Sequence, residues 1–241
     1  MPGLALSFAG AALPAAIIIA YFIKLDRKRP EPVGLIGRSV LYGFLAVIPA
    51  ALIEIVLERF VELPSGLAGT LYTAFVVAAS VEEATKLFFV KRYLYRRAEF
   101  DEIADGIVYS ICVSLGFAFV ENFIYGYGSL LILAVRAFTA VPGHAIFSGV
   151  MGYYLGIAKL EPGRPRAWVR GLAWAVALHG LYDFFLMSGT WMAFLILPLL
   201  VGGWVALRRL FRAAAAADEE RGRIGPTGGP PLGSSEASGP P

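Results

Sequence analysis

The sequence predicts an all-α, polytopic membrane protein with about seven transmembrane helices. Of its 241 residues, 58% are hydrophobic and only 16% are charged, whereas soluble domains average roughly 25% charged residues. Apolar stretches of about 20 residues, the length that a helix needs to cross the hydrocarbon core, recur along most of the chain. Because a chain in lipid must satisfy its own backbone polar groups, these stretches are predicted to be helices.

The spans are placed between breaks that are charged or rich in glycine and proline. The first span has its basic residues after it, so it is predicted to be a retained helix rather than a cleaved signal peptide. The predicted spans are 4–23, 33–57, 67–90, 106–128, 138–158, 168–187 and 191–207. Residues 1–212 thus form one transmembrane domain, and the Gly-, Pro- and Ser-rich residues 213–241 are predicted to be a disordered cytoplasmic tail.

Alternate breaks differ sharply in positive charge, which predicts the orientation. One set has only Arg59 and Arg136. The other set contains Lys24, Arg27, Lys28, Arg29, Lys91, Arg92, Arg96, Arg97, Lys159, Arg164, Arg166, Arg208, Arg209 and Arg212. By the positive-inside rule, the N-terminus is outside and the C-terminus is cytoplasmic. The net charge of +3 therefore reflects topology in a lipid bilayer, and no nucleic-acid partner is expected.

An acidic run precedes the fourth span. Glu99, Asp101, Glu102 and Asp105 lie on the predicted cytoplasmic side. We interpret them as a solvated loop face in front of a helix start, where negative charge is favoured.

Polar residues inside the spans are the main functional signal. Each ionisable group near the bilayer centre costs roughly 2.5–3.5 kcal/mol, so such groups are expected to face a bundle interior and to have partners. These residues are Glu54, Glu82, Glu83, Lys86, Glu121, Asn122, His144, His179 and Asp183. Because the acids and both histidines come from different spans, they could converge to bind a divalent metal or to activate a water.

Helical spacing predicts which of these residues pair. Glu82 and Lys86 are four residues apart, as are His179 and Asp183, so each pair shares a helix face. Glu83 projects about 100° away from Glu82, so the two glutamates are expected to address different neighbours.

Structural roles are the alternative for each residue taken singly. A lone histidine is most often a packing residue, Glu82 with Lys86 can be a structural ion pair, and Asn122 fits a packing role. We interpret Glu54 as reaching the interface. Along straight helices the functional residues would also fall into two layers about 10 Å apart, which a helix break at Pro142 and Gly143 would partly close.

Five short motifs, in order, resemble the PrsW family of intramembrane proteases over roughly residues 67–187. They are E-E-x-x-K, an Asp-Gly pair, F-x-x-x-E-N, Pro-Gly-His and H-x-x-x-D, which contain Glu82, Glu83, Lys86, Asp105, Glu121, Asn122, His144, His179 and Asp183. Lys86 stands one place before the Arg of the related CAAX prenyl-peptidase and bacteriocin-processing enzymes, and Glu121 replaces their second-motif His. The sequence is therefore similar to the PrsW branch.

The resemblance implies an intramembrane endopeptidase, a hydrolase of the cell membrane that acts on membrane-anchored protein substrates. It implies catalytic roles for Glu82, Glu83, Glu121, His144, His179 and Asp183. Glu82 or Glu83 would be the general base, and Asp183 would hold His179. His144, His179 and Glu121 would bind a divalent metal such as zinc, or would act without metal around a glutamate-activated water.

Two other functions remain open at the level of sequence. Chains of intramembrane Glu, His and Asp also serve proton relays, so an ion- or proton-coupled transporter or channel is the first alternative, although no inverted repeat is evident. A catalytically inactive membrane scaffold is the second.

Overall fold

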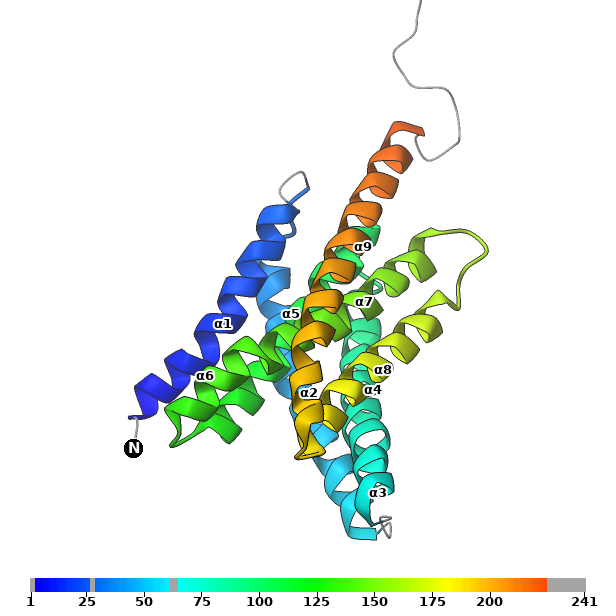
Figure 1. Cartoon of the computed structure of the whole chain (residues 1–241). Coiled ribbons are helices and arrows are strands. Elements are labelled where there is room, and N and C mark those ends of the chain that lie inside the picture. The colour runs from blue at the N-terminus through cyan, green and yellow to red at the C-terminus, as the bar shows by residue number, and fades with distance from the viewer. Residues whose placement is uncertain (1–2, 27–28, 61–64, 225–241) are drawn as a thin grey trace, which may run out of the picture.

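The computed structural model describes residues 3–26, 29–60 and 65–224, and these form helices joined by short turns (Figure 1). This confirms the predicted all-α class for the described residues. The elements are α1 (Leu4–Leu25), α2 (Val33–Phe60), α3 (Gly66–Tyr72), η1 (Thr73–Ala79), α4 (Ser80–Phe89), η2 (Val90–Leu94), α5 (Ile103–Gly126), α6 (Leu130–Phe138), α7 (Ala140–Leu160), α8 (Ala167–Met187), η3 (Trp191–Leu195) and α9 (Ile196–Ile224).

Five helical stretches within the described residues are long and apolar enough to cross a membrane, and they match five of the predicted spans. They are Leu4–Leu25, Val33–Phe60, Ile103–Gly126, Leu130–Leu160 and Trp191–Arg223. The other two predicted spans, 67–90 and 168–187, are helical but are not among the five. Both of them carry ionisable residues, which lower the hydropathy of a stretch.

The helix that contains α4 is continuous from α3 to η2 and includes two π-helical segments, η1 and η2. The turns η1 and η2 are π-helical, and at their ends the amides of Ser80 and Tyr95 donate to the carbonyls of Phe75 and Val90, five residues back. Such wide turns are rare and often occur at functional sites. They bracket α4, which carries three of the buried ionisable residues.

Two local expectations are corrected at α6, α7 and α9. The break comes at Thr139, between α6 and α7, whereas Pro142 and Gly143 lie in the first turn of α7. Proline is tolerated there because first-turn amides have no partner within the helix.

The tail is expected to begin at Ala213, but α9 continues to Ile224. Residues 225–241 lie outside the described residues.

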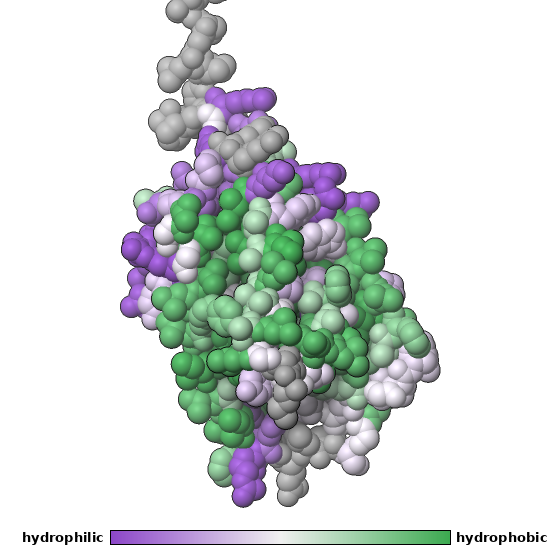
Figure 2. Space-filling view, turned by 90° about the vertical axis from the view of Figure 1, so that its left-hand side faces the viewer, coloured by the Kyte–Doolittle hydropathy of each residue, from purple (hydrophilic) through white to green (hydrophobic). Residues whose placement is uncertain are grey.

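The helix α5 forms the centre of the bundle. In its most apolar stretch 89% of the residues are buried, against 17% for α2. On the face shown in Figure 2, hydrophobic residues cover most of the middle of the molecule, and most of the hydrophilic residues lie toward its upper end. A helix that is apolar all round belongs in a core, and the outward apolar side chains of the surrounding helices suit a lipid environment.

The start of α5 explains the acidic run that precedes it. The amides of Asp101 and Glu102 donate to the Asp105 carboxylate at 2.8 and 2.7 Å, and Asp218 of α9 accepts from the amides of Ile103 and Ala104. Glu99 and Asp101 are exposed as expected, but the expectation of a solvated face is wrong for Glu102 and Asp105, which are buried. The unpaired amides of a helix start draw them inward.

Glycines let α5 contact α7 and α2 backbone to backbone. A Cβ atom added at Gly152 of α7 would overlap the carbonyl oxygen of Gly106 on α5, and one added at Gly43 of α2 would overlap that of Val113. Small residues at such crossings allow close helix packing in membranes.

We expect Gly152→Ala to lower the free energy of unfolding by about 1–3 kcal/mol, because α5 and α7 would have to move apart. The matched control is Gly202→Ala on α9, where a Cβ atom would meet no atom within 4 Å; it should be neutral or slightly stabilising. Thermal unfolding in detergent micelles measures both. Equal losses in the two variants would contradict the proposed role of the close contact.

Candidate active site

All six predicted catalytic residues lie in one cluster where α4, α5, α7 and α8 meet. Glu121 lies 2.8 Å from His144, and the ring centroids of His144 and His179 are 5.3 Å apart. The expectation of two layers about 10 Å apart, which assumed straight and untilted helices, is therefore wrong. Figure 1 shows the reason: α7 and α8 run obliquely to α4. The number of residues counted from a helix end therefore does not give the depth of a side chain in the bundle.

Lys86 is the centre of the cluster. Its ammonium lies 2.9 Å from Glu82 Oε2, 2.8 Å from Glu83 Oε1 and 3.0 Å from His144 Nδ1, and its side chain is 0% exposed. The predicted Glu82–Lys86 pair is confirmed. The expectation that Glu82 and Glu83 address different neighbours is wrong, because the long lysine side chain reaches both carboxylates.

Glu83 is fully enclosed by hydrogen-bonding partners. Besides Lys86, it accepts from Ser148 Oγ at 2.7 Å and lies 3.1 Å from His179 Nδ1. These three partners hold the carboxylate in place, and the Glu83 side chain is 0% exposed. Glu83 is thus buried among groups that hydrogen-bond to it.

His179 is held by α4 as well as by its own helix. Its Nδ1 faces Glu83 at 3.1 Å, and its Nε2 lies 3.4 Å from Asp183 Oδ2 and 3.9 Å from Glu82 Oε2. The ring of Phe147 stacks on the imidazole with centroids 5.0 Å apart. The predicted contact of Asp183 with His179 is present, but Glu83 makes the shorter one.

His144 links Lys86 to Glu121 through its two ring nitrogens. When the Lys86 ammonium donates to Nδ1, the proton of the neutral imidazole lies on Nε2 and points at Glu121, 2.8 Å away. Arg136 of α6 contacts the same Glu121 oxygen at 3.4 Å and donates to Asn122 at 2.7 Å. The Glu121 carboxylate is therefore held between an imidazole and a guanidinium.

Two members of the cluster were missed by sequence reasoning. Ser148 lies one helical turn after His144, so its position on the same face could have been found from spacing. Arg136 was interpreted as an anchor or topology determinant because it lies in a predicted break between spans. Its contact with the cluster depends on α6, whose apolar sequence within that break is the signal that could have found it.

Glu54 is not hydrogen-bonded to this network in the described part of the chain. Its Oε1 is buried and has no hydrogen-bond partner among the described residues. The carboxylate is therefore not simply exposed at the interface, as the sequence interpretation proposed.

A small polar cavity of about 40 Å³ opens within the cluster. It is lined by Glu82, Glu121, Arg136, Ala140, His144, Phe147, His179, Tyr182, Asp183 and Leu186. Because about 10–15 Å³ of such space is enough for one water, the cavity has room for at least one water among charged and imidazole groups. Glu83 is not part of its wall.

Three residues of the cluster fit a divalent metal ion. Glu82, His144 and His179 each offer a ligand atom, and these atoms lie within 4.8 Å of one another. Two imidazoles and one carboxylate match the donors of catalytic zinc sites. The predicted set had Glu121 in place of Glu82. Coordination through Nε2 of His144 requires the proton on Nδ1, so His144 would then give up its bond from Lys86.

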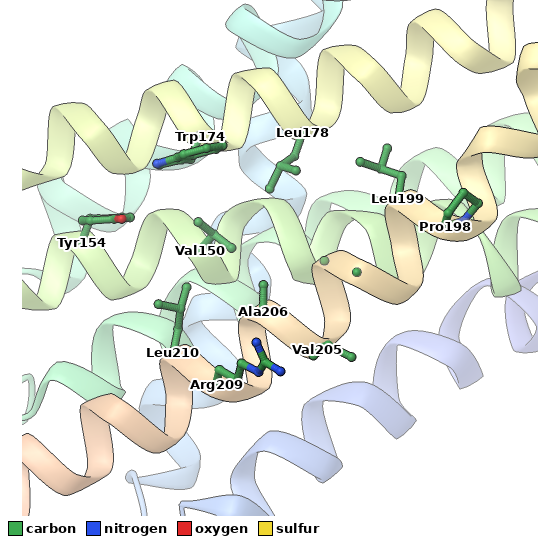
Figure 3. Close-up of a pocket in the computed structure, with 12 residues that line it drawn as sticks. Val150, Tyr154, Trp174, Leu178, Pro198, Leu199, Val205, Ala206, Arg209 and Leu210 are labelled. Atoms are coloured by element: carbon green, nitrogen blue, oxygen red, sulfur yellow. The ribbon is translucent and has the colours of Figure 1, made fainter.

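A larger groove of about 620 Å³ lies between α7, α8 and α9 (Figure 3). Its walls are mostly apolar, with Trp174 and Leu178 on α8 facing Leu199 and Ala206 on α9. None of the six predicted catalytic residues is among its described lining residues. The predicted catalytic residues therefore gather at the small polar cavity and not at this apolar groove.

Comparison with known proteins identifies one family. The model of the PrsW family intramembrane metalloproteases matches residues 31–207. "Protease PrsW" of Geobacillus kaustophilus is 37% identical over 83% of this chain and 88% of its own length. Its namesake in Bacillus subtilis is 37% identical over 83% and 92%, and that of Oceanobacillus iheyensis is 34% identical over 86% and 96%. No solved structure gives a significant match.

Proposed function

Because the chain belongs to the PrsW family of intramembrane metalloproteases, we propose that the polar cavity is its active site and cleaves membrane-anchored protein substrates. The observation that carries this proposal is the group formed by Glu82, His144 and His179 around a water-sized cavity. Intramembrane ionisable residues are costly and mark functional sites. Here they are collected at one point inside an apolar bundle.

We further propose that seven helices cross the cell membrane, with the N-terminus outside and the C-terminus in the cytoplasm. The alternation of basic breaks supports this orientation. The spans 67–90 and 168–187 would complete the seven. They carry the ionisable residues that the cavity requires, and their polar faces are turned inward, away from lipid.

The proposed roles follow from which carboxylates reach the cavity. Glu82, His144 and His179 would hold a divalent ion, which when bound supplies a Lewis acid and lowers the pKa of water. Glu121, on the cavity wall and oriented by Arg136, accepts the proton of the attacking water. Arg136 also offers positive charge where an oxyanion develops.

The remaining residues position this set. Glu83, which lies outside the cavity wall, fixes His179 and receives the Ser148 hydroxyl. A carboxylate behind a ligand imidazole fixes its ring orientation and raises its basicity. With Nδ1 held by Glu83, His179 would bind the ion through Nε2, and Asp183, whose Oδ2 lies 3.4 Å from that nitrogen, stands beside the ion site. Lys86 pairs with both adjacent glutamates and offsets one of their two negative charges.

Purified protein in proteoliposomes with a single-span reporter protein tests the function. The protease should release a shortened reporter, and the Glu121→Gln variant should not. The same vesicles, loaded with a pH-sensitive dye, test the transporter alternative. Proton movement without any cleavage would reject the proposed active site.

We expect purified protein to contain about one equivalent of a transition-metal ion such as zinc, held by two imidazoles and a carboxylate. Elemental analysis should find the ion lost from His179→Ala and retained in Glu121→Gln, since Glu121 is assigned to the proton and not to the metal. Chelation should stop cleavage, and added zinc should restore it. Full activity in protein without metal would instead favour a glutamate-activated water.

A further inference from the structure

A second group of acidic side chains lies far from the proposed active site. Asp26 follows α1, Glu31 precedes α2, and Asp105 is in the first turn of α5. Each of the three offers a carboxylate oxygen, and these oxygens lie within 4.8 Å of one another. Asp105 is separated from Glu121 by 16 residues of α5, about 24 Å of helix. The two groups are therefore distinct sites.

Two oxygens of this group are buried without a hydrogen-bond partner in the described part of the chain. They are Oδ2 of Asp26, which is 7% exposed, and Oδ1 of Asp105, which is 0% exposed. The amides of Asp101 and Glu102 hold the other Asp105 oxygen, Oδ2, and so fix the orientation of this carboxylate. Buried polar atoms nearly always have a partner, and two unpartnered acceptors in one group of three close carboxylates indicate a missing positive group.

Two arginines among the described residues at this end of the molecule pair with other acids. Arg29 pairs with Glu102 at 2.8 Å, and Arg221 pairs with Asp218 at 3.1 Å. Among the described residues, no lysine or arginine forms an ion pair with the three carboxylates. Tyr109, which donates to Glu31, is neutral.

The charge balance at this point is therefore unfavourable. Burial, followed by repulsion from neighbouring carboxylates, raises the pKa of Asp26 to about 8. Burial, followed by a hydrogen bond with Asp105 and by repulsion from it, raises the pKa of Glu31 to about 10. These shifts express an excess of negative charge in a poorly solvated place. A bound cation would remove the excess, whereas protons shared between the carboxylates would remove it without any ligand.

We propose that Asp26, Glu31 and Asp105 bind a hard divalent cation, Mg²⁺ or Ca²⁺. Oxygen-only donors select such ions, whereas the two imidazoles of the proposed active site favour a transition metal. The cation ties the end of α1 and the start of α2 to the start of α5. Its role is structural: it fixes the end of the helix that carries Glu121.

Titration of the full-length protein in detergent micelles tests this site. After chelation, Ca²⁺ and Mg²⁺ are added separately and binding is followed by calorimetry. Wild-type protein should bind one equivalent of at least one of these ions. Asp26→Asn and Glu31→Gln should weaken that binding at least about tenfold, because each removes a ligand charge. Asp26 makes no side-chain hydrogen bond that this change would break among the described residues.

Two controls separate this site from general effects. Glu99→Gln removes an exposed acid from the same end of the molecule, and Glu82→Gln alters the other site; both should bind the cation as wild type does. The bound ion should also raise the thermal unfolding midpoint of wild type but not that of Asp26→Asn. Absence of binding by folded wild-type protein, or unchanged binding in both ligand variants, would overturn the proposal in favour of shared protons.

Discussion

Lys86→Met should reduce the free energy of unfolding by about 3–5 kcal/mol, the cost of leaving buried charge without its partner. Methionine keeps most of the length and volume of the lysine stem, so the change removes chiefly the ammonium. Glu82 and Glu83 would then face each other, buried and uncompensated, and His144 would lose its donor. Cleavage should be abolished as well, because three of the groups that Lys86 orders form or support the proposed metal site.

Unfolding in mixed micelles of increasing denaturing detergent measures this loss. The control is Lys24→Met, which removes an exposed lysine and should change stability by less than about 0.5 kcal/mol. Adding Glu83→Gln to Lys86→Met should recover part of the stability, since one of the stranded charges is removed. A loss below about 1 kcal/mol in Lys86→Met would mean that the carboxylates are neutral in the folded protein.

Glu82→Gln should lower the cleavage rate by at least about 100-fold, because loss of a direct ligand should cost more than the roughly 10–100-fold lost when a residue behind a ligand is changed. The glutamine amide oxygen can still accept from Lys86, so the fold should persist. Metal content should fall together with activity, because the amide is a poor ligand. Reporter cleavage and elemental analysis on the same preparation measure both quantities.

Two comparisons make this result specific. Glu58→Gln makes the same chemical change at an exposed position on α2 and should leave the rate unchanged. Glu121→Gln should lose activity and keep its metal. If Glu82→Gln retained both full activity and full metal content, the assignment of Glu82 would be refuted.

The sequence predicted relations within a helix well. Residues four apart share a face whatever the tertiary structure, so Glu82 with Lys86 and His179 with Asp183 were predicted and are found in contact. Span positions were also predictable, because apolar length is a local property. The short motifs then indicated which helix faces contribute residues to one site.

Relations between helices could not be predicted in the same way. The depth of Glu121 relative to His179 depends on helix tilt, which no residue pattern specifies. The contact of Arg136 with Glu121 requires α6, a short apolar helix in a stretch that the sequence analysis assigns to a break between spans. The burial of Glu102 and Asp105 follows from the unpaired amides at the start of α5, and only the assembled bundle shows that α9 covers them.

The wide turn η1 imposes a constraint on chain length. Each residue of a helix advances the side chains by about 100°, so the loss of one residue between Thr73 and Ala79 would rotate all that follows unless the winding changed as well. Glu82, Glu83 and Lys86 would then leave the interior together. The length of the segment Thr73–Ala79 is therefore more constrained than the identity of its side chains. Among active relatives, insertions and deletions in this segment should be rarer than substitutions.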